Sequence, residues 1–201
     1  MKTYTVDEAV ERIAVLGVQG AARPYLLGVV GPPGAGKSTL AELITAPVLP
    51  MDGYHFANEY LDRLGLRQRK GAPETFDAAG FASALRRLRD GQDVVAPRFD
   101  REIDEGIAGA IALRGDDAVI VTEGNYLLHD RGGWQVIRPL LDEVWYLEID
   151  DDVRRDRLIE RHRRYGRSAV DAARWAAEVD EPNAVLVRAT RDRADAVVVS
   201  R

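Results

Sequence analysis

An eight-residue loop directly after an apolar run constrains this chain more than any other feature. Residues 31–38 read Gly-Pro-Pro-Gly-Ala-Gly-Lys-Ser and satisfy every position of the pattern G-x-x-x-x-G-K-[ST]. The apolar residues before the loop predict a buried strand, and those after it predict a helix. A glycine-rich turn that matches by chance is the alternative, and these flanking elements disfavour it. The segment therefore predicts a site for the phosphates of a nucleoside triphosphate.

The residue types of the loop fit that chemistry. Backbone N–H groups can surround a phosphate only where side chains leave the approach open, and Gly34 and Gly36 provide this freedom. We expect Lys37 to reach the β- and γ-phosphates and the hydroxyl of Ser38 to bind Mg²⁺, with the positive end of the helix directed at the anion. The predicted nucleotide-binding residues of the loop are Gly31, Gly34, Ala35, Gly36, Lys37, Ser38 and Thr39.

Length and composition indicate one ordinary globular domain over residues 1–201. The chain is 46% hydrophobic, and it has no apolar stretch near the roughly 20 residues of a membrane span. The absence of cysteine excludes thiol catalysis, thiolate metal sites and disulfides. Because the first residues also lack the pattern of a secretion signal, we expect a cytoplasmic protein.

The distribution of charge bears on partners. The formal net charge is −5, although seven arginines crowd residues 154–167. A net acidic chain is not an obvious nucleic-acid binder, and we expect neither nucleic acid nor membrane as a partner. The expected partner is a small-molecule acceptor, and the sequence leaves a homodimer open.

Helical and strand-like segments alternate along the chain. The spacing of apolar residues predicts a first helix over residues 6–18. Strands are expected at 26–30, 48–51, 94–97, 118–122, 144–149 and 196–199, and further helices at 38–45, 78–89, 135–141, 151–164, 168–179 and 182–190. Several strands lack apolar–polar alternation, which indicates burial on both faces. We therefore expect an α/β, three-layer P-loop NTPase fold with a mostly parallel central sheet and helices on both faces.

Residues that follow the strands are candidates for the site, since ligands of such sheets lie at the carboxyl ends of the strands. Asp52 follows the second predicted strand and is our candidate general base, although a turn role before Gly53 is the alternative. Tyr54 and His55 are equally compatible with substrate contact and with packing. Glu123 follows the fourth strand, where a carboxylate can orient Mg²⁺ or can cap a neighbouring element.

Two turn-rich segments lie between those strand ends. Asp77 is more readily explained as the N-cap of the following helix than as a ligand-binding residue. Arg98, Asp100 and Arg101 follow a predicted strand and are candidates for substrate contact, the alternative being a solvated surface turn.

The arginine-rich segment allows two interpretations. On a helix from residue 151, Arg154, Arg157, Arg161 and Arg164 fall on one broad face, which could be solvated and stabilised by neighbouring acids. The other interpretation is a helical lid over about residues 154–168 that closes on the phosphates. In that case Arg161 and Arg164 would stabilise phosphoryl transfer, and Arg167 would contact the substrate.

Taken in order, these segments resemble the phosphoribulokinase, uridine kinase and bacterial pantothenate kinase family from about residue 26 to residue 199. The loop at 31–38 is similar to the phosphate loop of that family, and Asp52-Gly53-Tyr54 is similar to the segment that holds its base. Pro97-Arg98-Phe99-Asp100 is similar to its substrate segment, and Glu123-Gly124 to the segment with its Mg²⁺-side carboxylate. The resemblance implies a phosphotransferase that uses ATP and Mg²⁺. It also implies that Arg157 contacts nucleotide within the lid and that Thr190 and Arg191 lie in a C-terminal turn near adenine.

Some residues depart from the family pattern. Uridine kinases place a histidine a few residues beyond the tyrosine of the substrate segment, and residues 99–104 contain none. The sequence thus indicates a kinase for a small-molecule hydroxyl, such as a nucleoside, a sugar or a pantothenate-like alcohol. A P-loop switch or assembly NTPase and a catalytically silent nucleotide-binding regulator remain alternatives.

Overall fold

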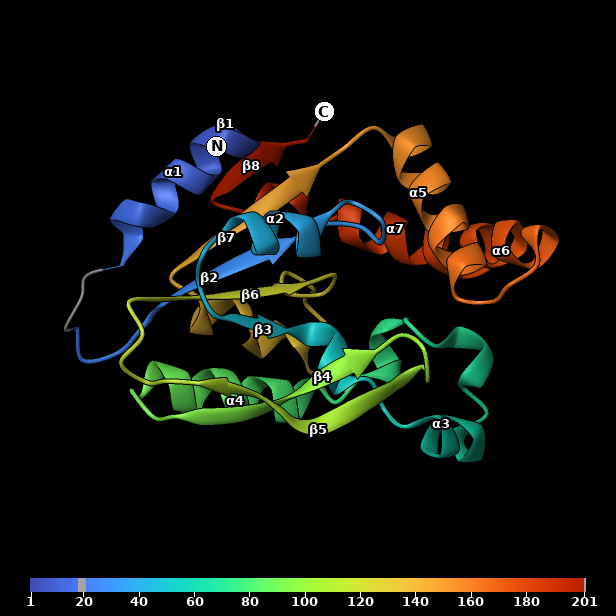
Figure 1. Ribbon diagram of the computed structural model, residues 1–201, viewed down its shortest axis with the longest axis horizontal. Helices are drawn as coiled ribbons and strands as arrows, with labels where there is room; N and C mark the ends of the chain where they lie inside the picture. The colour runs from blue at the N-terminus through green and yellow to red at the C-terminus, as the bar shows by residue number, and fades with distance from the viewer. Residues whose placement is uncertain (18–20, 201) are drawn as a thin grey trace.

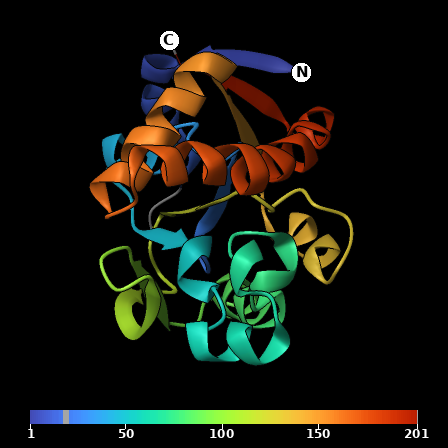
Figure 2. The same cartoon turned by 90° about the vertical axis from the view of Figure 1, so that its right-hand side faces the viewer.

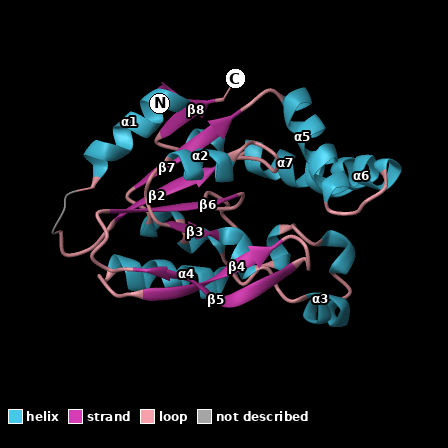
Figure 3. Cartoon of the chain, in the orientation of Figure 1, coloured by secondary structure: helices cyan, strands magenta, loops and turns pink. Residues whose placement is uncertain are grey.

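Six parallel strands form the central sheet of the protein (Figures 1 and 3). The computed structural model describes residues 1–17 and 21–200. The strand order is β1-β8-β7-β2-β6-β3, and every neighbouring pair runs parallel. The strands are β1 (Lys2–Thr5), β2 (Tyr25–Val30), β3 (Val48–Pro50), β6 (Val119–Gly124), β7 (Glu143–Glu148) and β8 (Ala196–Val199).

Alternate residues of the sheet point into two separate cores. Leu26 and Val30 of β2 join one cluster, whereas Leu27 and Val29 join the other, as the two-residue period of a strand requires. The second cluster contains residues of α1 (Val6–Leu16) and α2 (Lys37–Leu43), so these helices cover one face of the sheet. The other face is covered by α4 (Ala78–Arg89), by the 3₁₀ turns Trp134–Val136 and Arg138–Leu140, and by α7 (Glu181–Arg188).

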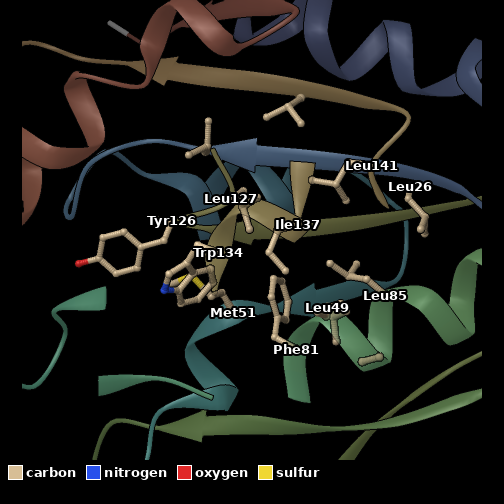
Figure 4. Close-up of a cluster of buried hydrophobic side chains, with 14 of the residues drawn as sticks. Leu26, Leu49, Met51, Phe81, Leu85, Tyr126, Leu127, Trp134, Ile137 and Leu141 are labelled. Carbon is tan, nitrogen blue, oxygen red and sulfur yellow. The ribbon is translucent and has the colours of Figure 1, made fainter. Parts of the chain in front are cut away.

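The larger core is rich in aromatic side chains. Trp134 and Phe81 are fully buried and pack with Tyr126 and Met51 (Figure 4). Trp134 also donates from Nε1 to the carbonyl of Pro73 at 3.1 Å. This core fixes the carboxyl ends of β3 and β6, because Met51 is the first residue after β3 and Tyr126 is the second residue after β6.

A two-stranded antiparallel hairpin, β4 (Val94–Asp100) with β5 (Glu105–Leu113), lies apart from the central sheet (Figure 3). The prediction of a strand at 94–97 was therefore correct, but its expected place in the parallel sheet was wrong. The small helix α3 (Asn58–Leu64) and the 3₁₀ turns Met51–Tyr54, Arg67–Arg69 and Pro73–Thr75 complete this part of the molecule.

The C-terminal third is helical up to the last strand. Helix α5 (Asp151–Arg164), α6 (Ala169–Trp175), a π-helical turn (Ala176–Asp180), α7 and the 3₁₀ turn Arg191–Arg193 follow one another. Figure 2 shows α5 and the helices from α6 to α7, in orange and red, lying above the green-blue helix α3. Asp150 caps α5 by accepting hydrogen bonds from the N–H groups of Asp152 and Val153.

Most predicted elements are present, with three differences. Pro139 divides the predicted helix 135–141 into two 3₁₀ turns, because proline cannot continue the hydrogen-bond ladder. The helix predicted at 168–179 changes to π-helical winding after Trp175. The first helix ends at Leu16, and its predicted end at residue 18 lies outside the described residues. No helix within residues 1–17 and 21–200 has both the length and the hydrophobicity needed to cross a membrane.

Candidate functional site

The loop between β2 and α2 requires glycine at two positions. Gly34 and Gly36 have φ values of +82° and +94°, in the left-handed region that side chains disfavour. A Cβ atom at Gly34 would also lie 2.7 Å from Leu158 and 2.9 Å from the carbonyl oxygen of Arg154. The loop thus exposes its backbone where the sequence pattern predicts a phosphate.

Lys37 is buried at the start of α2. Its Nζ donates to the carbonyls of Gly31 and Pro32 at 2.9 and 3.2 Å and to Oδ1 of Asn125 at 2.7 Å. Burial lowers the pKa of Lys37 to about 8, although the nearby charges of Glu123 and Asp52 oppose the shift. An anionic ligand beside Nζ would favour the charged ammonium.

Ser38 and Glu123 are adjacent, as their predicted shared role requires. The hydroxyl of Ser38 donates to Oε1 of Glu123 at 3.1 Å, and Glu123 stands near the end of β6. Burial and the neighbouring charge of Asp52 raise the pKa of Glu123. Glu123 is buried and Ser38 is exposed, so this oxygen pair is open on one side. The pair fits Mg²⁺, which would favour the ionised carboxylate. Within the described residues no three acidic or histidine side chains cluster to hold a metal, so phosphate and water would supply the other ligands.

Asp52 lies in the 3₁₀ turn after β3 and is paired with an arginine from the hairpin. Nη2 of Arg101 donates to Oδ2 of Asp52 at 3.0 Å. Burial opposes ionisation of Asp52, but Arg101, with His55, Lys37 and Arg161, outweighs it and holds its pKa below the ordinary value. Asp52 is therefore a carboxylate at neutral pH, as a proton acceptor must be.

Two cavities meet at Asp52. The first, of about 440 Å³, is lined by the phosphate loop and α2, and we call it the phosphate cavity. The second, of about 470 Å³, is lined by His55, Lys70, Phe99 and Asn183 among others, and we call it the acceptor cavity. The residues that line both cavities are Pro33, Asp52, Arg101, Asn125 and Arg161.

The arginines of α5 divide into different environments. Arg154 is fully buried and binds Asp151, Glu181 and the carbonyl of Pro33, so it anchors α5 to the phosphate loop. Arg161 lines both cavities and Arg157 lines the phosphate cavity. Arg164 is exposed and lines neither. Arg167 lies over the ring of Trp175 at 3.9 Å and lines the acceptor cavity.

Arg161 forms no salt bridge with any residue that the structure describes. Burial and the charge of Arg101 lower its pKa. Arginine nevertheless stays charged at neutral pH. Arg161 is half-buried where the two cavities meet, and the charges of Asp180, Asp52 and Glu123 only partly offset the cost of burial. A cation in this position is suited to an anionic ligand.

The other predicted substrate residues are distributed unevenly. His55 lines the acceptor cavity between Phe76 and Phe99, and its Nδ1 lies 2.8 Å from the carbonyl of Asp52. Tyr54 instead packs edge-on against Phe81 and lines neither cavity.

Two predicted substrate residues of the hairpin point elsewhere. Arg98 is exposed and lies 3.7 Å from Asp100, and neither residue lines the acceptor cavity. Asp77 is the N-cap of α4, as expected, because its carboxylate accepts from the N–H of Gly80 at 2.8 Å.

Thr190 and Arg191, predicted near adenine, are not brought to the phosphate cavity. The hydroxyl of Thr190 donates to the carbonyl of Val187, and Arg191 binds Glu148. Thr190 lines a separate surface cavity with His129 and Leu186. Arg191 instead holds the end of β7 through its ion pair with Glu148.

Two amides that the sequence did not single out belong to the site. Asn125 bonds Lys37 and lines both cavities. Asn183 is only 5% exposed and lines the acceptor cavity, and its side-chain amide forms no hydrogen bond with any residue that the structure describes. An amide that reaches the cavity and bonds no described residue is available to a polar ligand. Only the spatial arrangement reveals these residues, because neither belongs to a recognisable motif.

The fold and this arrangement of loop, lysine and carboxylates define a P-loop kinase. The model of the phosphoribulokinase/uridine kinase family matches residues 26–201, and the chain belongs to that family. The chain is 32% identical to the Escherichia coli protein YggC, named "uncharacterized", over 92% of this chain and 82% of that protein. It is 33% identical to a "putative uridine kinase" of Schizosaccharomyces pombe, over 68% of this chain and 66% of that protein.

Solved structures agree with this assignment. A "putative fructose transport system kinase" from a Silicibacter species is 35% identical and has a TM-score of 0.85, with 96% of this chain and 98% of that chain covered. YFH7 from Saccharomyces cerevisiae, described as a "putative P-loop containing kinase with a circular permutation", has a TM-score of 0.82 at 15% identity, over 98% of each chain. At that identity the second likeness shows the fold alone.

Proposed function

We propose that the protein transfers the γ-phosphoryl group of Mg-ATP to a hydroxyl of a small molecule: a nucleoside, a sugar or a pantothenate-like alcohol. One observation carries the proposal: the phosphate and acceptor cavities share Asp52, Arg101, Asn125 and Arg161. A phosphoryl donor in one cavity and an acceptor in the other would meet at the predicted base.

Asp52 is the group that would accept the proton of the acceptor. In the proposed reaction the acceptor oxygen forms a bond to the γ-phosphorus while the bond between that phosphorus and the β–γ bridging oxygen breaks. The hydroxyl proton passes to Asp52, whose carboxylate Arg101 keeps ionised and oriented. The products are ADP and the phosphorylated acceptor.

The cations around this point would stabilise the transferring group. Lys37 is positioned by two carbonyl oxygens of the phosphate loop and by Oδ1 of Asn125, and Arg161 forms no salt bridge with a carboxylate of residues 1–17 and 21–200. Lys37 is therefore held in place before a ligand binds, which is the condition under which electrostatic stabilisation is most effective. Mg²⁺ bound at Ser38 and Glu123 would neutralise charge on the phosphates.

The acceptor cavity favours a polar molecule of modest size with an apolar face. His55, Phe76, Phe99 and Trp175 provide ring surfaces, while Asn183 and Arg167 provide polar groups. The names of the relatives suggest the first acceptors to test, namely fructose, uridine and pantothenate.

A switch NTPase is the main alternative, and the acceptor cavity disfavours it. Such a protein needs a nucleotide site and a water molecule, but it does not need a second cavity that opens on the base. A silent regulator is disfavoured because Lys37, Ser38, Asp52 and Glu123 are all present, with Lys37 bonded to the loop, Ser38 bonded to Glu123 and Asp52 paired with Arg101.

The test is Mg-ATP turnover by the purified protein against nucleosides, pantothenate, free sugars and sugar phosphates, with product masses determined. A phosphorylated acceptor supports the proposal and names the substrate class. Hydrolysis that no acceptor accelerates would contradict it and favour the switch NTPase.

A further inference from the structure

The segment before β2 lies outside the region that matches the family model, which begins at residue 26. The structure nevertheless gives it a defined place. Strand β1 pairs in parallel with β8, with Lys2 opposite Ala196 and Thr5 opposite Val199. A capping box of Thr5 and Glu8 then begins α1 at Val6.

This pairing brings the start of α1 to the carboxyl edge of the sheet. Since β1 and β8 run parallel in register, Val6 follows β1 where Ser200 follows β8. Both residues line the phosphate cavity. The strand order places β1 and β8 at the opposite end of the sheet from β3, which carries Asp52. The cavity therefore extends from the acceptor cavity to the N-terminal segment.

The two ends of the phosphate cavity differ in character. Near β3 and β6 it is lined by Asp52, Glu123 and Asn125, which are polar. Its other lining residues include Val6 and the apolar side chains Leu40, Leu43 and Leu147. Leu43, the last residue of α2, is 53% exposed, which leaves its side chain available to a ligand.

Arg157 provides a planar group at the same cavity. Nη1 of Arg157 lies 3.6 Å from the position that a Cβ atom of Gly36 would take, so the guanidinium covers the beginning of α2. Within residues 1–17 and 21–200 it forms no salt bridge. A guanidinium of this kind can stack on a flat ring as well as bind phosphate.

We propose that the N-terminal βα unit is part of the nucleotide site, with Val6 and Leu43 contacting the heteroaromatic base of the nucleoside triphosphate. The inference rests on the proposed function. With the γ-phosphate at Asp52 and the triphosphate on the loop, the nucleoside extends away from the acceptor, toward β8 and β1. Apolar side chains and a guanidinium plane are suited to a flat, weakly hydrated ring.

The test compares two ligands that share the phosphates and differ in the base. Dissociation constants for ATP and for inorganic tripolyphosphate are measured with Mg²⁺ for the native protein and for the double variant Val6→Ala, Leu43→Ala. We expect the variant to bind ATP about tenfold more weakly, because apolar contact area is lost. Its affinity for tripolyphosphate should stay within about twofold, because the phosphate loop is unchanged.

Val15→Ala is the matched control, since Val15 is 75% exposed on α1 and does not line the cavity. Leu43→Ala alone repeats the test at an exposed position that folding does not depend on. Equal loss of both ligands, or no loss of ATP affinity, would overturn the inference while leaving the kinase proposal intact. A native protein that binds neither ligand would overturn both.

Discussion

Arg101 donates a hydrogen bond to Asp52 at 3.0 Å and joins the β4–β5 hairpin to the end of β3. Both residues line the phosphate cavity and the acceptor cavity. The hairpin thus contributes to the site although it lies apart from the central sheet. Arg101 also helps to hold the pKa of half-buried Asp52 below its ordinary value, as a base that must be ionised requires.

Loss of Arg101 should raise the pKa of Asp52. Burial raises that pKa, and the charge of Arg101 is the largest influence that lowers it. In Arg101→Gln that charge is lost, so the effect of burial on the pKa of Asp52 becomes larger relative to the remaining charges. A base works above its pKa, and we therefore expect the acidic limb of the pH profile of kcat to move to higher pH in this variant. Arg98→Gln is the comparison, because exposed Arg98 lines neither cavity. An acidic limb that stays in place in Arg101→Gln would refute the coupling.

Nucleotide affinity should depend on the ionisation of Lys37. The pKa of Lys37 is lowered to about 8 by burial, so the ammonium is charged below that pH and neutral above it. Because the charged form attracts phosphate, the affinity for ATP should fall as pH rises through 8. The last proton of the phosphate chain dissociates at about pH 6, so this ionisation does not contribute to a change in affinity near pH 8. Lys37→Arg keeps its charge and should bind ATP with little change over this range, measured by calorimetry. The same decline in Lys37→Arg would assign the effect to another group.

Arg161 and Arg164 should differ sharply in their contribution to turnover. The sequence predicted both as catalytic, whereas the structure places Arg161 on both cavities and leaves Arg164 exposed. We expect Arg161→Gln to lower kcat by about a hundredfold or more, the usual cost of removing one preorganised charge-stabilising group. Arg164→Gln should stay within about twofold. Steady-state kinetics with saturating acceptor provides the measurement, and equal losses in the two variants would contradict the assignment.

Asn183 should govern the affinity for the acceptor. Its side-chain amide has no hydrogen-bond partner among the described residues. Asn183 lines the acceptor cavity and does not line the phosphate cavity. Asn183→Ala should raise KM for the acceptor by about tenfold and leave KM for ATP unchanged, as expected for one lost hydrogen bond to a ligand. Val185→Ala, at an exposed position of the same helix, is the control. An effect on ATP instead of the acceptor would show that Asn183 has a different role.

The sequence predicted elements that carry local signals and missed those that depend on distant partners. Helices α4 and α5 were placed within their observed bounds because capping residues and apolar spacing mark them. Strands β1 and β5 and the short helix α3 were not predicted. Strand β1 has four residues and depends on pairing with β8, and β5 contains small residues that are mostly exposed. Neither strand has the apolar run that identifies a buried strand.

The candidate site shows the same division. The contact of Ser38 with Glu123 follows from two recognisable motifs at neighbouring strand ends. The separation of Arg161 from Arg164 depends on how α5 is rotated against the loop, and buried Arg154 fixes that rotation. The use of Arg191 to bind Glu148 depends on the packing of the C-terminal turn, so the family resemblance alone could not place it.

Phosphoryl transfer with Asp52 as the base is tested by measuring, in one reaction, the amounts of ADP, phosphorylated acceptor and inorganic phosphate formed from Mg-ATP. We expect one phosphorylated acceptor for each ADP, and a loss of both in Asp52→Asn while ATP still binds. ADP matched by inorganic phosphate whether or not an acceptor is present, at a rate that Asp52→Asn does not change, would contradict it.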